Sequence, residues 1–269
     1  MCKVLKIARS TYYYISQFKK REKRIAREKE LNDAVTLVFK QSRESYGTRK
    51  IKAALAQQSI QISRRKIGKI MKQLNLVSVY IKAKYKNYMK PNEKDVPNVL
   101  NRSFKFKKKM EVLVSDLTYV RVGTQWHYIC LFVDLFNREI VGFSVGTRKD
   151  AHLVFQALSS IRYNLSNVQI FHTDRGKEFD NKLIDDALQA FGIQRSLSMK
   201  GCPYDNAVAE ATFKIIKSEF VSQYTFETIE SLRLELFDYI NWFNHHRLHS
   251  TLGYQTPSSY EKIDAGTMS

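Results

Sequence analysis

The order of strand-like and helical segments after residue 110 most restricts the folds that this chain can adopt. Segments 111–122, 127–136 and 138–146 are rich in apolar and β-branched residues and are joined by short turns, which predicts a meander of three strands. The later segments alternate: helix over 150–164, strand over 168–174, helix over 181–191, strand over 193–198 and helix over 205–221. This order predicts an α/β domain in which helices flank a five-stranded mixed sheet, followed by a helix over 226–246 and a polar tail.

The first 77 residues carry a different pattern, which predicts an all-α region. Residues 1–30 include a highly charged helical stretch, and apolar residues then recur at helical spacing over 31–58, interrupted at Tyr46-Gly47. Thr48 is the candidate N-cap of the second helix, and Ser63 is that of a third helix over 64–74. Three helices with a basic last helix resemble a helix-turn-helix DNA-binding module; a plain bundle with a solvated basic face is the alternative.

The net charge of +19 is distributed very unevenly along the chain. Residues 1–110 contain 30 Lys and Arg against 7 Asp and Glu, which gives +23, whereas residues 111–269 contain 15 against 19, which gives −4. Within 78–110, a predicted linker, basic and aromatic residues alternate, as in segments that contact phosphates and stack on bases. This distribution predicts nucleic-acid binding by the first 110 residues; a lysine-rich surface that contacts only water is the alternative.

Several other classes of protein are disfavoured by the composition. The chain contains no run of about 18 apolar residues, so no membrane-spanning helix is expected. Its first residues lack the long apolar run and the small-residue cleavage site of a secretory signal peptide. The three cysteines (Cys2, Cys130 and Cys202) lie far apart in the sequence, unlike those of a disulfide scaffold. These features favour a protein of the reducing cytoplasm.

Three carboxylates in the second half of the chain occupy positions that suit a metal site. Asp116 lies inside an apolar strand, where an unpaired charge is costly, and Asp174 ends the fourth strand, where α/β sheets present ligand sites. Glu210 shares one face of the last long helix with Lys214 and Lys217. The opposite face of that helix is predicted to pack on the sheet through Phe213, Ile216 and Phe220.

Carboxylates from two strands and one helix can converge on hard divalent cations, which prefer oxygen ligands. Two Mg²⁺ ions held in this way activate the attacking oxygen and stabilise the leaving oxygen in a phosphodiester displacement. A hydrogen-bonding or capping role for a strand-end aspartate is the alternative, and the residue types alone do not decide between the two.

Several longer strings place these carboxylates in a known pattern. The strings are YGTRKIKAAL, SDLTYV, LFVDLFNREIVGFSVG, HTDRGKEF, GCPYDNAVAEATFKIIKSE and NWFNHHRLHSTLGYQTP. Thirty-five residues separate Asp174 from Glu210, and Lys217 follows Glu210 by seven positions. On these strings and spacings the chain, over residues 1–262, resembles the transposases of bacterial insertion sequences that carry a retroviral-integrase-type DDE core. It is most similar to the product of their second reading frame, OrfB.

The resemblance implies a fold, a site and a reaction. It implies an RNase H-like core in which Asp116, Asp174 and Glu210 form the catalytic, metal-binding triad for two Mg²⁺ ions, with Mn²⁺ as a substitute. It also implies that Lys217 contacts DNA near the scissile phosphate. Members of this family cut a DNA strand at the end of the element with water, and the freed 3′-OH then attacks a second phosphodiester. A DNA transposase subunit that cleaves and transfers strands is therefore implied.

Other basic residues are candidates for DNA contacts. Lys214 and Arg175 are expected to neutralise phosphate charge beside the triad. Five further candidates lie in the basic helical region: Arg49, Lys50, Arg64, Arg65 and Lys69. The expected organisation is a helix-turn-helix-like region over 1–77, a linker over 78–110, the catalytic core over 111–222 and a C-terminal helical extension and tail over 223–269.

The expected partners follow from the resemblance. They are double-stranded DNA (the element ends and the target), a second copy of the chain when DNA is bound, and a helix-turn-helix protein from the upstream frame, OrfA, separate or fused. The expected location is the bacterial cytoplasm, at the nucleoid, with no membrane partner.

Two other functions stay open on the sequence. An RNase H-like nuclease would hydrolyse DNA without joining it, and a non-catalytic DNA-binding protein would regulate its parent element. Asp134 is expected to make strand-end hydrogen bonds rather than to act as an accessory acid, and Asp205 and Asn206 are expected to cap the helix of Glu210. Three histidines that no cysteine pair accompanies are expected to pack or contact phosphate rather than bind a metal: His245, His246 and His249.

Overall fold

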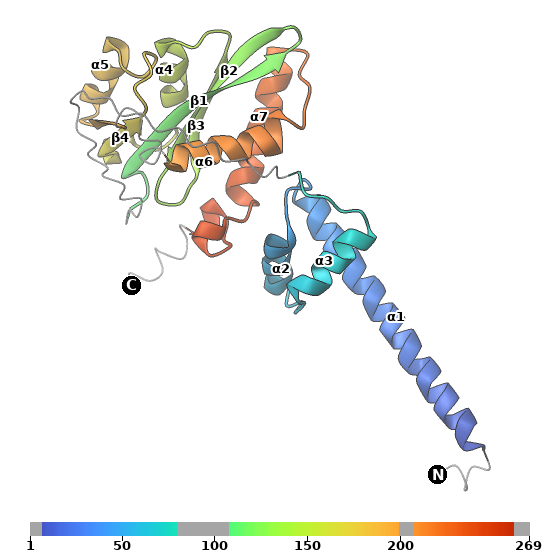
Figure 1. Ribbon diagram of the computed structural model, residues 1–269. Coiled ribbons are helices and arrows are strands. Elements are labelled where there is room, and N and C mark those ends of the chain that lie inside the picture. Colours follow the sequence, from blue (N-terminus) through green and yellow to red (C-terminus); the bar gives the residue numbers. More distant parts are fainter. Residues whose placement is uncertain (1–6, 80–107, 199–206, 261–269) are drawn as a thin grey trace, which may run out of the picture. The chain divides into compact units, whose positions relative to one another are not determined.

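The chain divides into two compact units, Met1–Ser78 and Val79–Ser269, each of which is described by itself (Figure 1). The computed structural model describes residues 7–79, 108–198 and 207–260, so most of the predicted linker, as well as Cys2 and Cys202, lies outside the described residues. Within the described ranges, no helix is long and apolar enough to cross a membrane.

Three helices form the first unit: α1 (Arg9–Gln41), α2 (Thr48–Gln57) and α3 (Arg64–Gln73). The third helix begins as predicted, because the Ser63 hydroxyl accepts a hydrogen bond from the backbone N–H of Lys66 at 3.2 Å. The predicted cap of the second helix is wrong by one residue. Gly47 is the N-cap, in an extended conformation without a side-chain capping bond, and Thr48 is already helical. The buried core includes Val35, Val38, Phe39, Ile51, Leu55, Ile67 and Ile70.

A five-stranded mixed sheet with the strand order β3-β2-β1-β4-β5 is the centre of the second unit. β1 (Val112–Val122), β2 (Gln125–Asp134) and β3 (Ile140–Gly146) form the predicted antiparallel meander. β4 (Ile170–Thr173) pairs with β1 in parallel, and β5 (Gln194–Leu197) pairs with β4 in parallel. The predicted α/β fold with a mixed sheet is confirmed, and it has the strand arrangement expected of an RNase H-like core.

Helices cover both faces of this sheet and make three layers (Figure 1). On one face, α6 (Ala207–Ile216) packs on β1, whose alternate residues such as Val114 and Val120 point toward it, and α7 (Ile229–His245) packs on β3. On the other face, α4 (Ala151–Ser159) and α5 (Lys182–Ala190) pack with Leu113 and Phe171. β1 therefore lies between two hydrophobic layers, which explains why it is apolar along most of its length.

The helix predicted over 150–164 ends earlier than the sequence pattern suggests. It begins at the expected place, with Asp150 accepting a hydrogen bond from the Leu153 N–H, but α4 stops at Ser159. The Ser160 hydroxyl donates to the Ala157 carbonyl at 2.7 Å and accepts from the Phe143 N–H at 2.8 Å. β3 approaches so closely here that a Cβ on Gly142 would lie 2.6 Å from the Ala157 oxygen. Only glycine fits at that contact.

The predicted helix over 205–221 is not one regular α-helix. The described part of α6 is followed by a π-helical turn over Lys217–Val221, in which the Ser222 N–H donates to the Lys217 carbonyl at 2.9 Å. Short π-turns of this kind often occur at functional sites in helices. The apolar stripe of Phe213, Ile216 and Phe220 is fully buried, as predicted. The expected caps Asp205 and Asn206 lie outside the described residues.

Candidate active site

Asp116 and Asp174 lie at the same level of two neighbouring parallel strands. Val114 of β1 is the register partner of His172 of β4, and each aspartate follows its partner residue by two positions. Adjacent strands are about 5 Å apart, so this register brings the two carboxylates side by side. Asp116 accepts a hydrogen bond from the Leu117 N–H at 2.7 Å, and Asp174 accepts one from the Gly176 N–H at 3.0 Å. Both side chains are half-buried.

Glu210 lies in the first turn of α6, on the side of the sheet toward which Val114 and Val120 point. The adjacent Ala209 is buried in the core and fixes α6 against β1, whereas Glu210 itself is exposed. Lys214 and Lys217 are exposed as well, so the polar face predicted for this helix does face solvent.

The electrostatics place Asp116 at the centre of this group. Burial raises the pKa of Asp116 to about 6, against the opposing effect of the hydrogen bond from Leu117. The negative charges of Asp174 and Glu210 raise the pKa further, while Lys217 lowers it. Burial also raises the pKa of Glu210. The three predicted triad members and Lys217 therefore lie within electrostatic reach of one another.

The raised pKa of Asp116 predicts a pH-dependent contribution to stability in the absence of divalent cations. The folded state holds the proton up to about pH 6, whereas the ordinary pKa is 3.8, so the contribution is present at low pH and lost as the pH rises from about 4 to 6. We expect the free energy of unfolding of the wild type, minus that of Asp116→Asn, to fall across this interval in urea titrations. A difference that stays constant with pH would contradict the raised pKa.

A buried glutamate with a lysine partner lies beside the two aspartates. Lys149 Nζ is 2.8 Å from Glu178 Oε1, and the glutamate is buried while the lysine is about half exposed. The hydrogen bond to Glu178 is the main cause that raises the pKa of Lys149, and Asp174 and Asp116 add to it. The Glu178 carboxylate packs directly over Gly176, where a Cβ would collide with it. The sequence analysis missed this pair, although Glu178 stands only four residues after Asp174.

The donor atoms at this place suit a hard divalent cation, because they are carboxylate oxygens. In the part of the chain that the structure describes, no three His, Cys, Asp or Glu side chains are close enough together to hold a metal ion. The pair of aspartates and the exposed Glu210 are thus neighbours rather than a closed ligand cage.

The predicted DNA contacts of the core have individual surroundings. Lys217 Nζ lies 5.2 Å from the ring centroid of Tyr119, above an exposed aromatic side chain. Lys214 is exposed on the same helix face. Arg175 is half-buried, and its Nε donates to the Ser198 carbonyl at 3.1 Å, which directs it toward the end of β5.

The predicted DNA contacts of the first unit gather on and before its last helix. On α3, Arg64, Arg65 and Lys69 are exposed, on the side opposite the buried Ile67 and Ile70. On α2 the two candidates differ: Arg49 is exposed, whereas Lys50 is half-buried with its Nζ 4.9 Å from the ring centroid of Tyr46.

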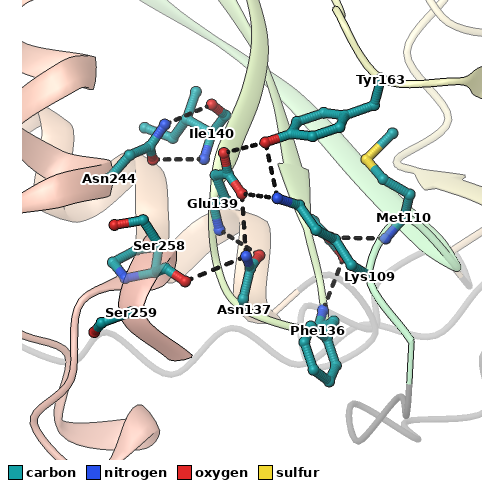
Figure 2. Close-up of polar contacts among 12 residues, drawn as sticks. Lys109, Met110, Phe136, Asn137, Glu139, Ile140, Tyr163, Asn244, Ser258 and Ser259 are labelled. Atoms are coloured by element: carbon teal, nitrogen blue, oxygen red, sulfur yellow. Dashed lines mark hydrogen bonds and ion pairs between the residues drawn. The ribbon is translucent and has the colours of Figure 1, made fainter. Parts of the chain in front are cut away.

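Asp134 makes the strand-end hydrogen bonds that the sequence predicted. Its two carboxylate oxygens accept from the backbone N–H groups of Met110 and Phe136, at 2.8 and 2.9 Å, and the side chain is fully buried. Close to it, Lys109 Nζ bonds to both Glu139 and Tyr163 at 2.8 Å (Figure 2). This polar cluster holds the start of β1 to the turn between β2 and β3.

The end of α7 and the segment after it hold the sheet at the turn between β2 and β3, and several residues of the predicted polar tail are buried there. Asn244 Oδ1 accepts from the Ile140 N–H at 3.0 Å and Asn244 Nδ2 donates to the Ile140 carbonyl at 2.9 Å, as another strand would (Figure 2). Asn137 donates to the Pro257 carbonyl at 3.3 Å. The buried tail residues include Arg247, Leu248, His249 and Leu252, and His249 packs edge-on against Phe243.

A buried ion pair connects this segment to the π-turn that follows α6. Arg247 donates from Nε and Nη2 to the two carboxylate oxygens of Glu219, both at 2.7 Å. The side chains are 4% and 2% exposed, and the Tyr239 hydroxyl also donates to Glu219, at 3.3 Å. Two parallel charge-assisted bonds fix orientation as well as distance. The pair therefore anchors the end of the helix that carries Glu210 and Lys217.

Three family models match separate parts of the chain. A model described as an integrase core domain matches residues 107–203, a second model with the same description matches residues 210–263, and an HTH-like domain matches residues 26–84. Asp116 and Asp174 fall in the first match, and Glu210 is the first residue of the second.

Three relatives with similar sequences are named as transposases of insertion sequences. The transposase for insertion sequence element IS904 of Lactococcus lactis is 30% identical over 239 residues, covering 87% of this chain and 94% of the relative. The putative transposase InsK for IS150 of Escherichia coli is 28% identical, covering 97% and 92%. Transposase InsF for IS3A, also of Escherichia coli, is 28% identical, covering 97% and 92%.

Solved structures with a similar chain path include two catalytic core domains of integrases. The HTLV-2 integrase core in complex with magnesium is 15% identical, with a TM-score of 0.43, and covers 55% of this chain and 94% of its own. The BIV integrase core is 19% identical, with a TM-score of 0.44, and covers 60% and 99%.

Proposed function

We propose a reaction for this chain, which belongs to the transposases of bacterial insertion sequences. In this proposal, the second unit cuts a DNA strand at the end of an element and joins the new 3′ end to other DNA. The similar relatives and the matching family models identify the chain as a DNA transposase with an integrase core and an HTH-like domain. The proposal adds the reaction steps and the residues that perform them.

The register of Asp116 and Asp174 is the observation that carries the proposal. Burial is the main cause that raises the pKa of Asp116, and the negative charge of Asp174, beside it on the neighbouring parallel strand, raises this pKa further. Such a pair is stabilised as two anions by a bound cation. With Glu210 in electrostatic reach, the arrangement supports a triad of oxygen ligands for divalent metal ions.

Mg²⁺ fits this donor set, since it prefers oxygen ligands and keeps part of its shell for water and substrate phosphate. In the proposal, Asp116 and Asp174 would hold two ions, Glu210 would add a ligand to the second ion, and Mn²⁺ could substitute. When bound, two such ions lower the pKa of the attacking oxygen and neutralise charge on the leaving oxygen. The contribution of the protein is to hold the carboxylates in position. The pairing of β1 with β4 and the packing of α6 do this.

The lysines beside the triad bind the substrate in this proposal. Lys217 and Lys214 are exposed on the helix face that carries Glu210, so both can contact the phosphates that flank the scissile bond. Arg175 contacts phosphate at the end of β5. Lys149 remains bound to Glu178 and holds the loop after Asp174 in place.

In this proposal the first unit binds DNA. The reaction also requires more than one copy of the chain. The exposed cations of α3 and α2 contact the DNA backbone, with Arg49, Lys50, Arg64, Arg65 and Lys69 as the contacts. Two DNA ends must be held together, which calls for a homo-oligomer on DNA. We also propose OrfA, separate or fused, as a partner, and the nucleoid in the bacterial cytoplasm as the place of action.

Strand joining tests the proposed reaction. With Mg²⁺, a duplex that ends in the terminal repeat with a 3′-OH should become joined to a labelled target, because the site that activates water also activates a 3′-OH. Denaturing gels should show labelled products longer than either substrate, and a chelator should remove them.

Two outcomes would contradict the proposed reaction. Only shortened strands would indicate a hydrolytic nuclease. Bound but intact DNA with every divalent metal would indicate a non-catalytic regulator of the element.

A further inference from the structure

The hairpin of β1 and β2 exposes an aromatic pair that neither the core nor the triad uses. Tyr119 is 57% exposed and Trp126 is 55% exposed, although both side chains are large and amphipathic. Their ring centroids are 5.2 Å apart, with an angle of 87° between the rings. A cross-strand aromatic contact of this kind stabilises a hairpin by only about 0.2–1 kcal/mol, and more than half of each side chain remains in water.

The strand register places cations beside this pair. Tyr119 is opposite Tyr128, and Arg121 is opposite Trp126, so all four side chains project from one face of the hairpin. Arg121 is exposed, and Lys217, the first residue of the π-turn after α6, places its Nζ 5.2 Å from the Tyr119 ring centroid. Aromatic faces interleaved with basic side chains are the composition of sites that bind single-stranded nucleic acid.

The pair also lies close to the triad. Tyr119 follows Asp116 by three residues on the same strand, which is about 10 Å along β1. Lys217 connects the two places, because it lowers the pKa of Asp116 and also contacts the Tyr119 ring. Since side chains alternate along a strand, Tyr119 and Asp116 point to opposite faces of β1. β4 pairs with β1 only as far as Val114, so a strand whose phosphate lies at the carboxylates can pass the edge of β1 beside Lys217 and bring a base to the aromatic pair.

We propose that Tyr119 and Trp126 form a stacking site for one unpaired nucleobase of the DNA strand that enters the triad. The inference rests on the proposed function, since it takes that strand as the ligand. A base inside a duplex is already stacked on both sides, so only a frayed or flipped-out base can use the site. Stacking on aromatic side chains is worth about 1–3 kcal/mol per base, and Lys217 and Arg121 would bind the adjoining phosphates.

Binding measured without divalent cations tests the site independently of cleavage. Three probes share one sequence: a fully paired duplex, a duplex whose last 3′ nucleotides are unpaired thymidines, and the same frayed duplex with abasic sites in place of those thymidines. We expect the full-length protein to bind the frayed duplex about tenfold more tightly than the abasic one, and Tyr119→Ala and Trp126→Ala to remove this difference. Tyr119→Phe should retain it.

Tryptophan fluorescence gives a second, direct measurement. The chain has two tryptophans, and Trp242 is buried in the core at 7% exposure. We expect the frayed duplex to quench the fluorescence of Trp126, the abasic probe to leave it unchanged, and Trp126→Phe to lose the signal while it retains affinity. Phe237→Ala, which removes another aromatic residue of similar exposure, 55%, from α7, is the matched control and should change neither measurement.

Several results would overturn the stacking site. The first is a Tyr119→Ala variant that binds each of the three probes as tightly as the wild type does. The second is a Tyr119→Ala variant that loses the same affinity for all three probes. The third is Trp126 fluorescence that the frayed duplex does not quench. If Tyr119→Ala does not fold, Tyr119→Leu keeps apolar packing on the hairpin and should still lose the preference for the frayed base. Strand joining by the wild type tests the proposed function, whereas the preference for the frayed base tests the stacking site. If strand joining fails while this preference remains, the proposed function is wrong and the stacking site is retained.

Discussion

The substitution Asp174→Asn abolishes both strand cleavage and strand joining while DNA binding is retained; this is the largest effect that we expect. Asn keeps the size of the side chain and its acceptor to the Gly176 N–H, but removes the negative charge that, in the proposed function, holds a cation beside Asp116. Loss of metal-assisted charge stabilisation costs several kcal/mol in the transition state, or about 10³-fold in rate. Single-turnover cleavage of end DNA measures the loss, and a gel-shift assay measures binding.

The matched control for this prediction is Asp186→Asn, which makes the same change at an exposed aspartate of α5. It should cleave and join DNA at the rate of the wild type. Cleavage by Asp174→Asn in Mg²⁺ at a wild-type rate would refute the assignment of the triad, and the loss of DNA binding by the same variant would point to a folding defect instead.

The second large effect is expected from Arg247→Ala, which leaves the carboxylate of Glu219 buried without its cation. Removing one partner of a buried, bidentate ion pair destabilises a protein by about 3–5 kcal/mol, because the remaining charge is not solvated. For a unit of this size, the loss corresponds to a fall in melting temperature of about 6–20 °C. Urea titrations monitored by Trp242, in a Trp126→Phe background, measure the change in the second unit.

A double variant separates the charge from the packing. Glu219→Gln with Arg247→Met fills nearly the same volume without buried charges and should recover most of the stability. Arg233→Ala, the same substitution at an exposed position of α7, should cost less than about 1 kcal/mol. If Arg247→Ala is as stable as Arg233→Ala, the pair does not anchor the helix of Glu210.

Local signals in the sequence predicted most of the second unit. Asp150 and Asn181 begin α4 and α5 because short polar side chains satisfy the first helical N–H groups, which is a local interaction. The position of Asp174 directly after an apolar strand was enough to place it at the carboxyl end of β4. The parallel register that brings it level with Asp116 is a pairing between distant segments, and the sequence pattern contains only the strands themselves.

The contacts that the sequence did not predict are those between residues far apart in the chain. Glu219 and Arg247 are separated by 28 positions, and Ile140 and Asn244 by 104. A string such as HHRLHSTLG is polar in composition, so it suggests an exposed tail unless its buried partner is known. The early end of α4 likewise depends on the contact of Ser160 with β3 rather than on the helical pattern of α4.

The ion pair between Glu219 and Arg247 forms late, because its two residues are made at different times during synthesis. Arg247 is translated 28 residues after Glu219, an interval of roughly 1–6 seconds at 5–20 residues per second. During that time the helices of the first unit have already been made, while the helix of Glu210 still lacks its anchor. The helix of Glu210 can therefore be anchored by this ion pair only after the segment that follows α7 has been made.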